Sequence, residues 1–320
     1  MRPCKQLLVV AAVFLSAVSF SREAWAERKI GILMFSDETR YNEAMNGITD
    51  RLREAGFSEP GTRLIVENAG ANKARAAELV KKYSAEKPDL IITLGTSIMV
   101  PIAREIKDVP VVFGVVYDPV AAGIAKDMKS SGNNTTGATT IFPMSKVIDL
   151  LMEFRKVGRL AVLYSPGEKN SEAQLKDLQE IQHLYGIRII PVPLTKKEEV
   201  GQILPDVLRT CDALYVTGSN LVNSQIAAIE KMATNANVVT ITHLDDLVAK
   251  GVLLGVCSDS YQNGRLVGEK VVRILNGARP SSIPIESPTE LHVMINLETA
   301  RAGRFRVPEE FMKKVTRKVD

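Results

Sequence analysis

The chain has 320 residues, of which 45% are hydrophobic and 24% are charged, and its formal net charge is +4. This composition is typical of a globular protein and excludes a disordered, collagen-like or coiled-coil chain. The nearly balanced charge argues against a nucleic-acid-binding protein, and three cysteines are too few for a disulfide-stabilised scaffold. The length predicts about two domains.

Residues 1–26 have the pattern of a secretory signal peptide. Arg2 and Lys5 precede an apolar run over 7–18, and Ala24-Trp25-Ala26 forms a small-x-small cleavage site. The alternative is a membrane anchor, but the apolar run is shorter than the ~20 residues that a membrane span requires. We therefore expect cleavage after Ala26 and export of the remaining chain.

From residue 29 to residue 115, short apolar segments alternate with segments of helical periodicity. In the first helical segment, Ala44, Ile48 and Leu52 recur on one stripe. The expected strands are 29–35, 63–67, 89–94 and 111–115, and the expected helices are 41–55, 72–86 and 95–107. Nearly continuous apolar strands separated by helices predict a parallel sheet that is covered on both faces.

The same alternation starts again after Pro143. The expected helices are 144–156, 170–185, 196–209, 222–235, 244–250, 260–276 and a terminal helix near 308–318. The expected strands are 159–164, 187–192, 212–217, 238–241, 252–256 and 290–296, and the proline-rich stretch 278–288 reads as an irregular connection. The fold class is therefore α/β, with two Rossmann-like lobes whose parallel sheets face each other across a ligand cleft.

Polar residues follow five of the expected strands, where ligands bind to parallel sheets. These loops are 36–39, 95–97, 117–119, 218–220 and 258–261. Thr96 and Ser97 either bind a carboxylate at a helix N-terminus or simply cap that helix. Asp118 either holds an ammonium group or opens a turn with Pro119. Five polar loops at five strand ends are stronger evidence for a ligand site than any one loop alone.

The sequence contains no recognisable catalytic or metal-binding motif. The histidines, His183, His243 and His292, are far apart and match no metal spacing, and no Walker, GxGxxG or GxSxG motif occurs. His243 follows a strand, so it either touches the cleft or caps a helix. Cys211 and Cys257 read as unpaired buried thiols, with a disulfide as the alternative. We expect neither an enzyme nor a bound cofactor or metal.

Several short motifs, in their order along the chain, carry a resemblance to a known family. They are Leu94-Gly95-Thr96, 116–123, 132–137, Leu214-Tyr215-Val216, Asp259 with Gly264-Arg265, 274–280 and 295–300. Together they resemble the substrate-binding proteins of ABC uptake systems, in the family related to tryptophan- and tyrosine-binding proteins. The resemblance spans nearly the whole chain after the expected signal peptide.

This resemblance implies a type I periplasmic binding fold. The first lobe would comprise 27–141 plus 259–284 and the second 142–258 plus 285–320, with hinges near 140–143, 257–259 and 284–288. It implies a monomer in the periplasm that captures a small amino-acid-like ligand, an aromatic amino acid being one candidate, and delivers it to an ABC permease in the inner membrane. An exported sensor that signals to a membrane receptor is the alternative. A secreted α/β enzyme would need a nucleophile–base pair or a metal site, and the sequence shows neither.

The resemblance and the strand ends together give a set of expected ligand-binding residues. They are Phe35, Thr96, Ser97, Tyr117, Asp118, Thr140, Ser219, Asn220 and Asp259. In such proteins the loop matching Thr96 and Ser97 typically meets the ligand carboxylate, and the loop matching Asp118 lies near the amino group. Where many relatives have Thr-Asp-Asn, this chain has Gly218-Ser219-Asn220, so a neutral serine replaces an acid and the ligand preference can differ. The aromatic rings of Tyr117, Tyr261 and Phe35 either stack on a ligand or pack within a lobe.

Overall fold

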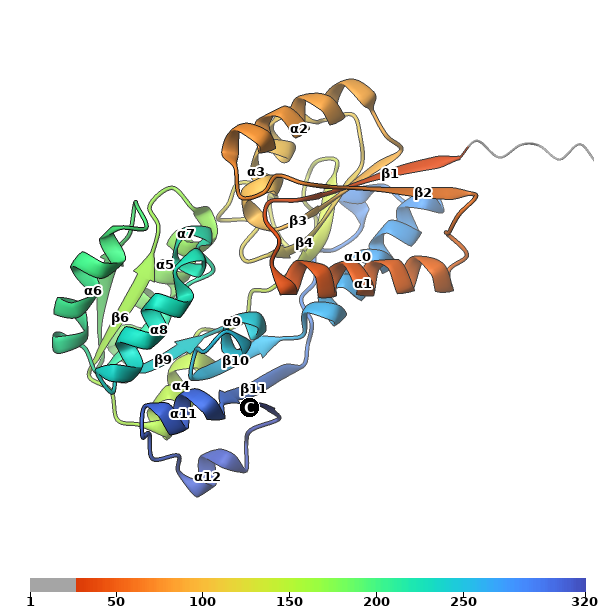
Figure 1. The fold of residues 1–320 in the computed structure, drawn as a ribbon. Coiled ribbons are helices and arrows are strands. Elements are labelled where there is room, and N and C mark those ends of the chain that lie inside the picture. Colours follow the sequence, from red (N-terminus) through yellow and green to blue (C-terminus); the bar gives the residue numbers. More distant parts are fainter. Residues whose placement is uncertain (1–26) are drawn as a thin grey trace, which may run out of the picture.

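The computed structural model describes residues 27–320, and the expected signal peptide at 1–26 lies outside the described residues. The elements form two sheets, each covered by helices, in two halves of the molecule (Figure 1). This arrangement confirms the expected two-lobed α/β fold. In the part of the chain that the structure describes, no helix is both long and apolar enough to cross a membrane.

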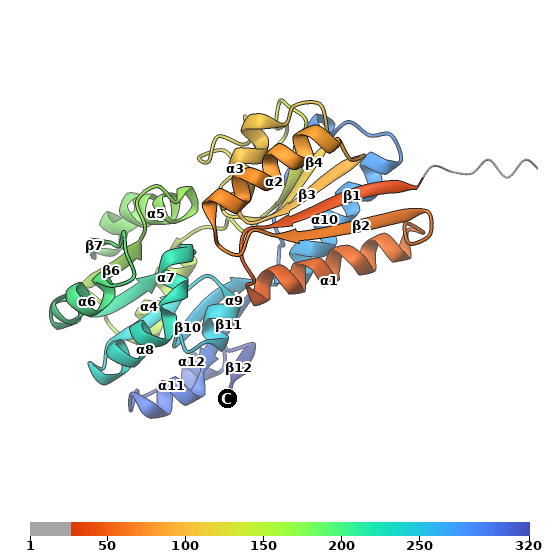
Figure 2. The same ribbon diagram turned by 45° about the horizontal axis from the view of Figure 1, so that its top comes forward.

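The first sheet has the strand order β2-β1-β3-β4-β5, and all its pairs are parallel. Its strands are β1 (Arg28–Met34), β2 (Thr62–Asn68), β3 (Leu90–Leu94), β4 (Val111–Val116) and β5 (Thr135–Thr139). The helices of this half are α1 (Thr39–Glu54), α2 (Lys73–Glu86), α3 (Thr96–Glu105) and α10 (Ser260–Leu275). Helix α10 comes from far along the chain and packs beside α1 (Figures 1 and 2). Gly264 allows this approach, since a Cβ there would lie 1.9 Å from the carbonyl oxygen of Ala44.

The second sheet has the order β12-β11-β10-β9-β8-β6-β7. Its strands are β6 (Arg159–Tyr164), β7 (Arg188–Pro193), β8 (Ala213–Val216), β9 (Val239–Thr242), β10 (Leu254–Ser258), β11 (Leu291–Asn296) and β12 (Arg317–Val319). The helices are α4 (Ser145–Phe154), α5 (Lys169–Tyr185), α6 (Glu199–Thr210), α7 (Asn220–Ser224), α8 (Ile226–Asn235), α9 (Asp245–Ala249), α11 (Leu297–Ala302) and α12 (Glu309–Met312). All strand pairs are parallel except β10 with β11, which are antiparallel.

Some elements differ from the sequence-based expectation. Strand β5 was not expected, because its Thr-Thr-Gly-Ala-Thr sequence contains no apolar run. The helix expected at 222–235 is two helices, α7 and α8, which meet at Gln225. The terminal helix expected at 308–318 is wrong, because only α12 is helical there and β12 pairs with β11 beyond it. Pairing on an open sheet edge cannot be read from three residues of sequence.

Each sheet buries apolar side chains on both of its faces. In the first sheet, Ile91 and Val111 belong to the cluster that packs against α2 and α3, and Ile92 and Val112 belong to the cluster that contains residues of α1 and α10. Successive strand residues point to opposite faces, so this sheet requires strands that are apolar throughout. Cys211 and Cys257 are both buried and unpaired, as the first of the two sequence readings expected.

The chain crosses between the halves at three places. The first lies between β5 and α4, the second at Asp259 between β10 and α10, and the third between η1 (Pro280–Ser282) and β11. At the third, Thr139 N donates to the carbonyl oxygen of Glu286 at 2.8 Å, which ties this crossing to β5. These crossings coincide with the expected hinges. That they act as hinges, and that the lobes have the expected boundaries, stay predictions.

Candidate ligand site

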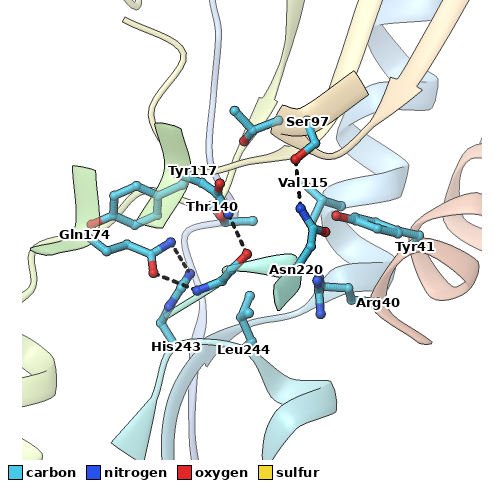
Figure 3. A pocket seen from close by; sticks show the side chains of 13 residues that line it. Arg40, Tyr41, Ser97, Val115, Tyr117, Thr140, Gln174, Asn220, His243 and Leu244 are labelled. Atoms are coloured by element: carbon cyan, nitrogen blue, oxygen red, sulfur yellow. Dashed lines mark hydrogen bonds between the residues drawn. The ribbon is translucent and has the colours of Figure 1, made fainter. Parts of the chain in front are cut away.

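A cavity lies between the two halves, at the carboxyl ends of the strands. It lies beside the loops after β1 and β3 and those after β6 and β8, which are the points where the strand order of each sheet reverses. Open α/β sheets bind ligands at such switch points. The cavity holds about 340 Å³ of empty space, part of it open to solvent. Its lining residues are Arg40, Tyr41, Thr96, Ser97, Val115, Tyr117, Thr140, Asn170, Gln174, Gly218, Asn220, His243 and Leu244 (Figure 3).

The first wall of the cavity comprises Arg40, Tyr41, Thr96 and Ser97, which come from the first turns of α1 and α3. Gly95 precedes α3 with φ +97°, and a Cβ there would lie 2.4 Å from the hydroxyl oxygen of Tyr41. Glycine therefore serves both the left-handed backbone and the close approach of Tyr41. The free N–H groups at the start of α3 give this wall a partial positive charge.

Arg40 forms a buried ion pair across the two halves. Its Nη1 donates to both carboxylate oxygens of Asp246 in α9, at 3.0 and 2.8 Å. Burial by itself lowers the pKa of Arg40, but the charges of Asp246 and Glu38 outweigh burial and raise it, so the group is a cation. Lys250 and Glu38 form a second ion pair across the same boundary, at 2.8 Å and closer to solvent.

The second wall comprises Asn170, Gln174, Gly218, Asn220, His243 and Leu244, all from the second half. Asn220 connects it to the first wall, because its Nδ2 donates to Ser97 Oγ at 2.8 Å and to Glu168 Oε2 at 3.1 Å. Both Nδ2 hydrogens are thus used, which leaves the side-chain oxygen of Asn220, Oδ1, as an acceptor. Figure 3 shows this oxygen turned toward Tyr41.

A hydrogen-bond chain fixes the rest of the second wall. Gly218 N donates to Gln174 Oε1 at 2.9 Å, so the amide nitrogen of Gln174 is the atom that faces His243 Nε2, at 3.4 Å. His243 Nε2 is therefore an acceptor, and the proton of the neutral ring sits on Nδ1, 2.8 Å from the hydroxyl oxygen of Tyr215. Burial, and secondly the charge of Arg40, lower the pKa of His243 to about 3. The wall is uncharged at neutral pH.

Asn170 presents an acceptor that has no partner. Its Nδ2 donates to the carbonyl oxygen of Gly218 at 2.6 Å, while its Oδ1 is buried without a hydrogen bond. A buried carbonyl oxygen without a partner costs free energy, so this atom favours a donor on a bound molecule.

The floor of the cavity comprises Val115, Tyr117 and Thr140, from the ends of β4 and β5. Val115 has φ +54°, a strained backbone for a β-branched residue. Its N–H donates to Asn263 Oδ1 at 3.0 Å, and Asn263 Nδ2 donates to the carbonyl oxygen of Thr139 at 3.0 Å. The fully buried Asn263 of α10 thus holds the strained strand end in place.

The structure brings five of the nine expected ligand-binding residues to this cavity. They are Thr96, Ser97, Tyr117, Thr140 and Asn220. Phe35 lies instead in a larger groove of about 1500 Å³, much of it open to solvent, on the other side of Ser97 and Asn220. Tyr261 is also elsewhere, and its hydroxyl lies 3.0 Å from Asp50 Oδ2.

The other three expected residues are outside the cavity lining, and their polar atoms are used locally. Asp118 Oδ1 accepts the N–H groups of the two residues that follow Pro119, each at 2.9 Å. Ser219 caps α7 through the N–H of Val222, at 3.2 Å. Asp259 caps α10 and pairs with Arg317. For Asp118 the turn alternative describes the geometry, and Ser219 and Asp259 act as helix caps.

The sequence did not single out Arg40, Tyr41, Asn170 or Gln174. Arg40 and Tyr41 lie in the first turn of α1, directly after the loop 36–39, whereas Asn170 and Gln174 lie in the first two turns of α5, after a strand whose loop was not among the five. A sequence signal that could have found them is their position in the helices after β1 and β6, the strands that border the switch points. His243, left open between the cleft and a helix cap, lines the cavity. Among residues 27–320, no group of His, Cys, Asp and Glu side chains is arranged to hold a metal ion.

The sequence is similar to those of known proteins over nearly its whole described length. The sequence pattern of a family described as ABC transporter substrate binding protein matches residues 29–319. A tyrosine-binding protein of Clostridioides difficile (strain R20291) is 24% identical over 279 residues, which are 86% of this chain and 81% of that protein.

Solved structures share the fold, and two of them are similar over most of this chain. An ABC domain from Streptococcus pneumonia in complex with L-Trp has 23% identity and a TM-score of 0.87, and the match covers 92% of this chain and 100% of that one. The ligand-free, open structure of a substrate binding protein with adhesive properties from Clostridium difficile has 26% identity and a TM-score of 0.72, with the same coverage.

Proposed function

The chain belongs to the ABC transporter substrate-binding protein family, whose members bind solutes and are not enzymes, and we propose that it captures a small amino-acid-like ligand in the periplasm. It would then deliver this ligand, as a monomer, to an ABC permease in the inner membrane. The observation that carries the proposal is the cavity at the switch points of both sheets, whose two walls come from different halves of the molecule.

Closure of the halves would be the capture step. The pairs of Arg40 with Asp246 and of Ser97 with Asn220 join the halves, so they exist only while the walls face each other. A ligand that contacts both walls binds this arrangement better than an open one and shifts the population toward it. The three chain crossings would absorb the rotation as hinges.

Aromatic side chains support an aromatic amino acid as the ligand. Tyr41 and Tyr117 line the cavity, and the rings of Tyr117 and His243 meet edge to face with centroids 5.4 Å apart. Such rings offer both apolar surface and directed edges to a ligand ring. The relatives support the same class, one being a tyrosine-binding protein and another having been solved with L-Trp.

Calorimetric titration tests the proposal. The protein would be unfolded, dialysed free of ligand, refolded and titrated with each of the twenty amino acids, with native mass spectrometry of the untreated protein as a second readout. We expect saturable one-to-one binding of at least one aromatic amino acid. If none of the twenty binds and the untreated protein carries no small molecule, the proposed function is wrong.

A pair of glycine variants ties the binding to this cavity. At Gly218 a Cβ would lie 3.2 Å from Asn170 Nδ2 and 3.3 Å from Gln174 Nε2, whereas at Gly201 in α6 it would meet nothing within 4 Å. Gly218→Val should weaken binding at least tenfold because it fills the second wall. Gly201→Val should leave binding unchanged. Equal affinities for the two variants would place the ligand somewhere else.

A further inference from the structure

The cavity has an asymmetric charge. Of its thirteen lining residues, Arg40 is the one whose side chain carries a charge, and none is Asp or Glu. A zwitterionic amino acid brings both a carboxylate and an ammonium group, and a buried ammonium group is costly unless a carboxylate pairs with it. The lining therefore offers one cationic group, itself paired with Asp246, to the carboxylate end of such a ligand, and it offers no anionic group to the ammonium end.

Arg40 is placed to receive a carboxylate. Only its Nη1 is used by Asp246, at 2.8 and 3.0 Å, and the guanidinium carbon lies 4.9 Å from the centre of the Tyr41 ring. Glu38 Oε2 lies 3.7 Å from the same Nη1, and the Tyr41 hydroxyl is a second hydrogen-bonding neighbour of Arg40. A guanidinium has five N–H donors in a planar fork, so the N–H groups of Nε and Nη2 that Tyr41 does not use are the donors available to a carboxylate. The hydroxyl groups of Thr96 and Ser97 lie at the start of α3 on the same wall.

The carboxylates near the cavity are occupied elsewhere. Asp246 pairs with Arg40, and Asp177 accepts the hydroxyl of Tyr117 at 2.6 Å. Glu168 accepts the backbone N–H of Asn220 at 2.7 Å and its Nδ2 at 3.1 Å, and Asp118 closes its own turn. None of these four carboxylates lines the cavity. The lining residues that carry amide acceptors are neutral, among them Asn170, whose Oδ1 is buried without a partner, and Asn220.

We propose that the site selects its ligand by the carboxylate, through Arg40, and that it does not require an ammonium group. The ligand class is a small carboxylic acid with an aromatic or apolar body and a hydrogen-bond donor on the α-carbon, which is an amino group or a hydroxyl group. A neutral amide oxygen accepts a hydrogen bond from either donor, so Asn170 discriminates little between them. This inference rests on the proposed function and narrows its ligand.

A matched ligand series tests it by calorimetry on the refolded protein. The series is L-tryptophan, its 2-hydroxy analogue indole-3-lactate and its decarboxylated analogue tryptamine, together with L-tyrosine, 4-hydroxyphenyllactate and tyramine. We expect each hydroxy acid to bind within about tenfold of its amino acid, and each amine to bind at least a hundredfold more weakly. An amine that binds as well as its amino acid, or a hydroxy acid weaker by more than a hundredfold, overturns the inference while the proposed function stands. If no member of the series and no other amino acid binds, both fail.

A double variant assigns the selectivity to Arg40. Arg40→Gln alone would leave Asp246 as a buried unpaired charge, so Arg40→Gln with Asp246→Asn is the better variant, because it replaces the ion pair by two amides. Circular dichroism and the urea midpoint check that it folds. The ratio of amino-acid to amine affinity should fall at least tenfold toward unity. A folded double variant that keeps the wild-type ratio overturns the role of Arg40. Lys314→Ala is the control, since the exposed Lys314–Glu153 pair lies outside the cavity lining and includes no partner of Arg40 or Asp246, so its loss should leave the ratio unchanged.

Discussion

The two walls of the cavity differ in how their polar groups are balanced. The first wall holds the charge of Arg40, and the partner of that charge, Asp246, belongs to the opposite half. The second wall is neutral, and its side chains are bonded largely to one another, as Gln174 is to Gly218 and to His243. The charge of the first wall therefore has its nearest partner only when the halves are together, while most hydrogen bonds of the second wall are made within its own half.

This difference separates two properties of the site. The energy that holds the halves together depends on the ion pair of the first wall. Loss of this pair leaves a charge either exposed to solvent or buried without its partner. The shape against which a ligand rests depends on the second wall, whose internal hydrogen bonds hold it before closure. Substitutions on the two walls should accordingly change different observables.

The largest effect is expected from Asp246→Ala, which removes the carboxylate that pairs with Arg40 of the first wall. The closed arrangement would bury a guanidinium whose remaining ion-pair partner is Glu38 at 3.7 Å, a cost of up to about 3–5 kcal/mol, whereas the open arrangement would hydrate it. Ligand affinity should fall about a hundredfold or more by calorimetry, the radius of gyration from X-ray scattering should increase, and the urea midpoint should change little.

Lys250→Ala provides the matched comparison for that variant. The side chain of Lys250 is 36% exposed and lies 2.8 Å from Glu38 and 3.4 Å from Asp246 Oδ2, so these ion pairs are worth about 1 kcal/mol or less. If Lys250→Ala weakens binding as much as Asp246→Ala does, burial of the Arg40 pair is not what holds the halves together.

A second prediction concerns an acidic residue that lies in the second half but outside the cavity wall. Glu230 is buried in α8, and burial raises its pKa to about 8, with one oxygen unpaired and the other bonded to Thr240 at 2.8 Å. The folded state keeps the proton that the unfolded state loses above its pKa of about 4.5, so stability falls as pH rises from 4.5 to 8. By pH 7 the loss is about 3 kcal/mol.

Glu230→Gln should remove that loss. Its free energy of urea unfolding, measured from pH 4.5 to 8, should fall less with pH than that of the unsubstituted protein, while ligand affinity at pH 7 should be the same for both. A change in affinity would mean that the core of the second half is coupled to the second wall. Stability of that half and ligand binding would then not be independent.

A smaller effect is expected from the titration of the second wall itself. His243 has a pKa of about 3 in the folded state and about 6.5 when unfolded, so the unfolded state binds a proton first as pH falls. Stability should decline by about 2 kcal/mol between pH 6.5 and pH 5. His243→Gln should remove this part of the decline in urea unfolding, and His183→Gln, at an exposed position of α5, is the control. A decline that survives in His243→Gln and disappears in His183→Gln would contradict a neutral second wall.

The sequence predicts the fold well because strand burial and helix periodicity are local. It predicts Thr96, Ser97 and Asn220 at the cavity because each directly follows a strand, whose end the sheet places at the cleft. It cannot tell which polar residue at a strand end is free for a ligand. Asp118 and Asp259 have the chemistry of ligand contacts, yet backbone N–H groups a few residues away use their carboxylates.

Arg40 shows the opposite case. An arginine at the start of an exposed helix is ordinarily a solvated residue, and only Asp246, 206 residues away, makes it a buried one. Strand β12 is similar, since three residues become a strand only through pairing with β11. Contacts over such separations are set by tertiary packing, which local pattern does not contain.

The smallest effect is expected from the hydrogen bond that joins the two walls directly. Ser97→Ala removes the bond from Asn220 Nδ2, but Glu168 still accepts from the same nitrogen, so that no buried donor loses its last partner. The cost should be about 1 kcal/mol, or roughly fivefold in ligand affinity by calorimetry. Ser224→Ala is the control, because the Ser224 hydroxyl donates within its own helix and Ser224 lines the larger groove that contains Phe35. A loss of a hundredfold in Ser97→Ala would mean that the Ser97 hydroxyl contacts the ligand itself, and that the first wall recognises the carboxylate with a hydroxyl as well as with its charge.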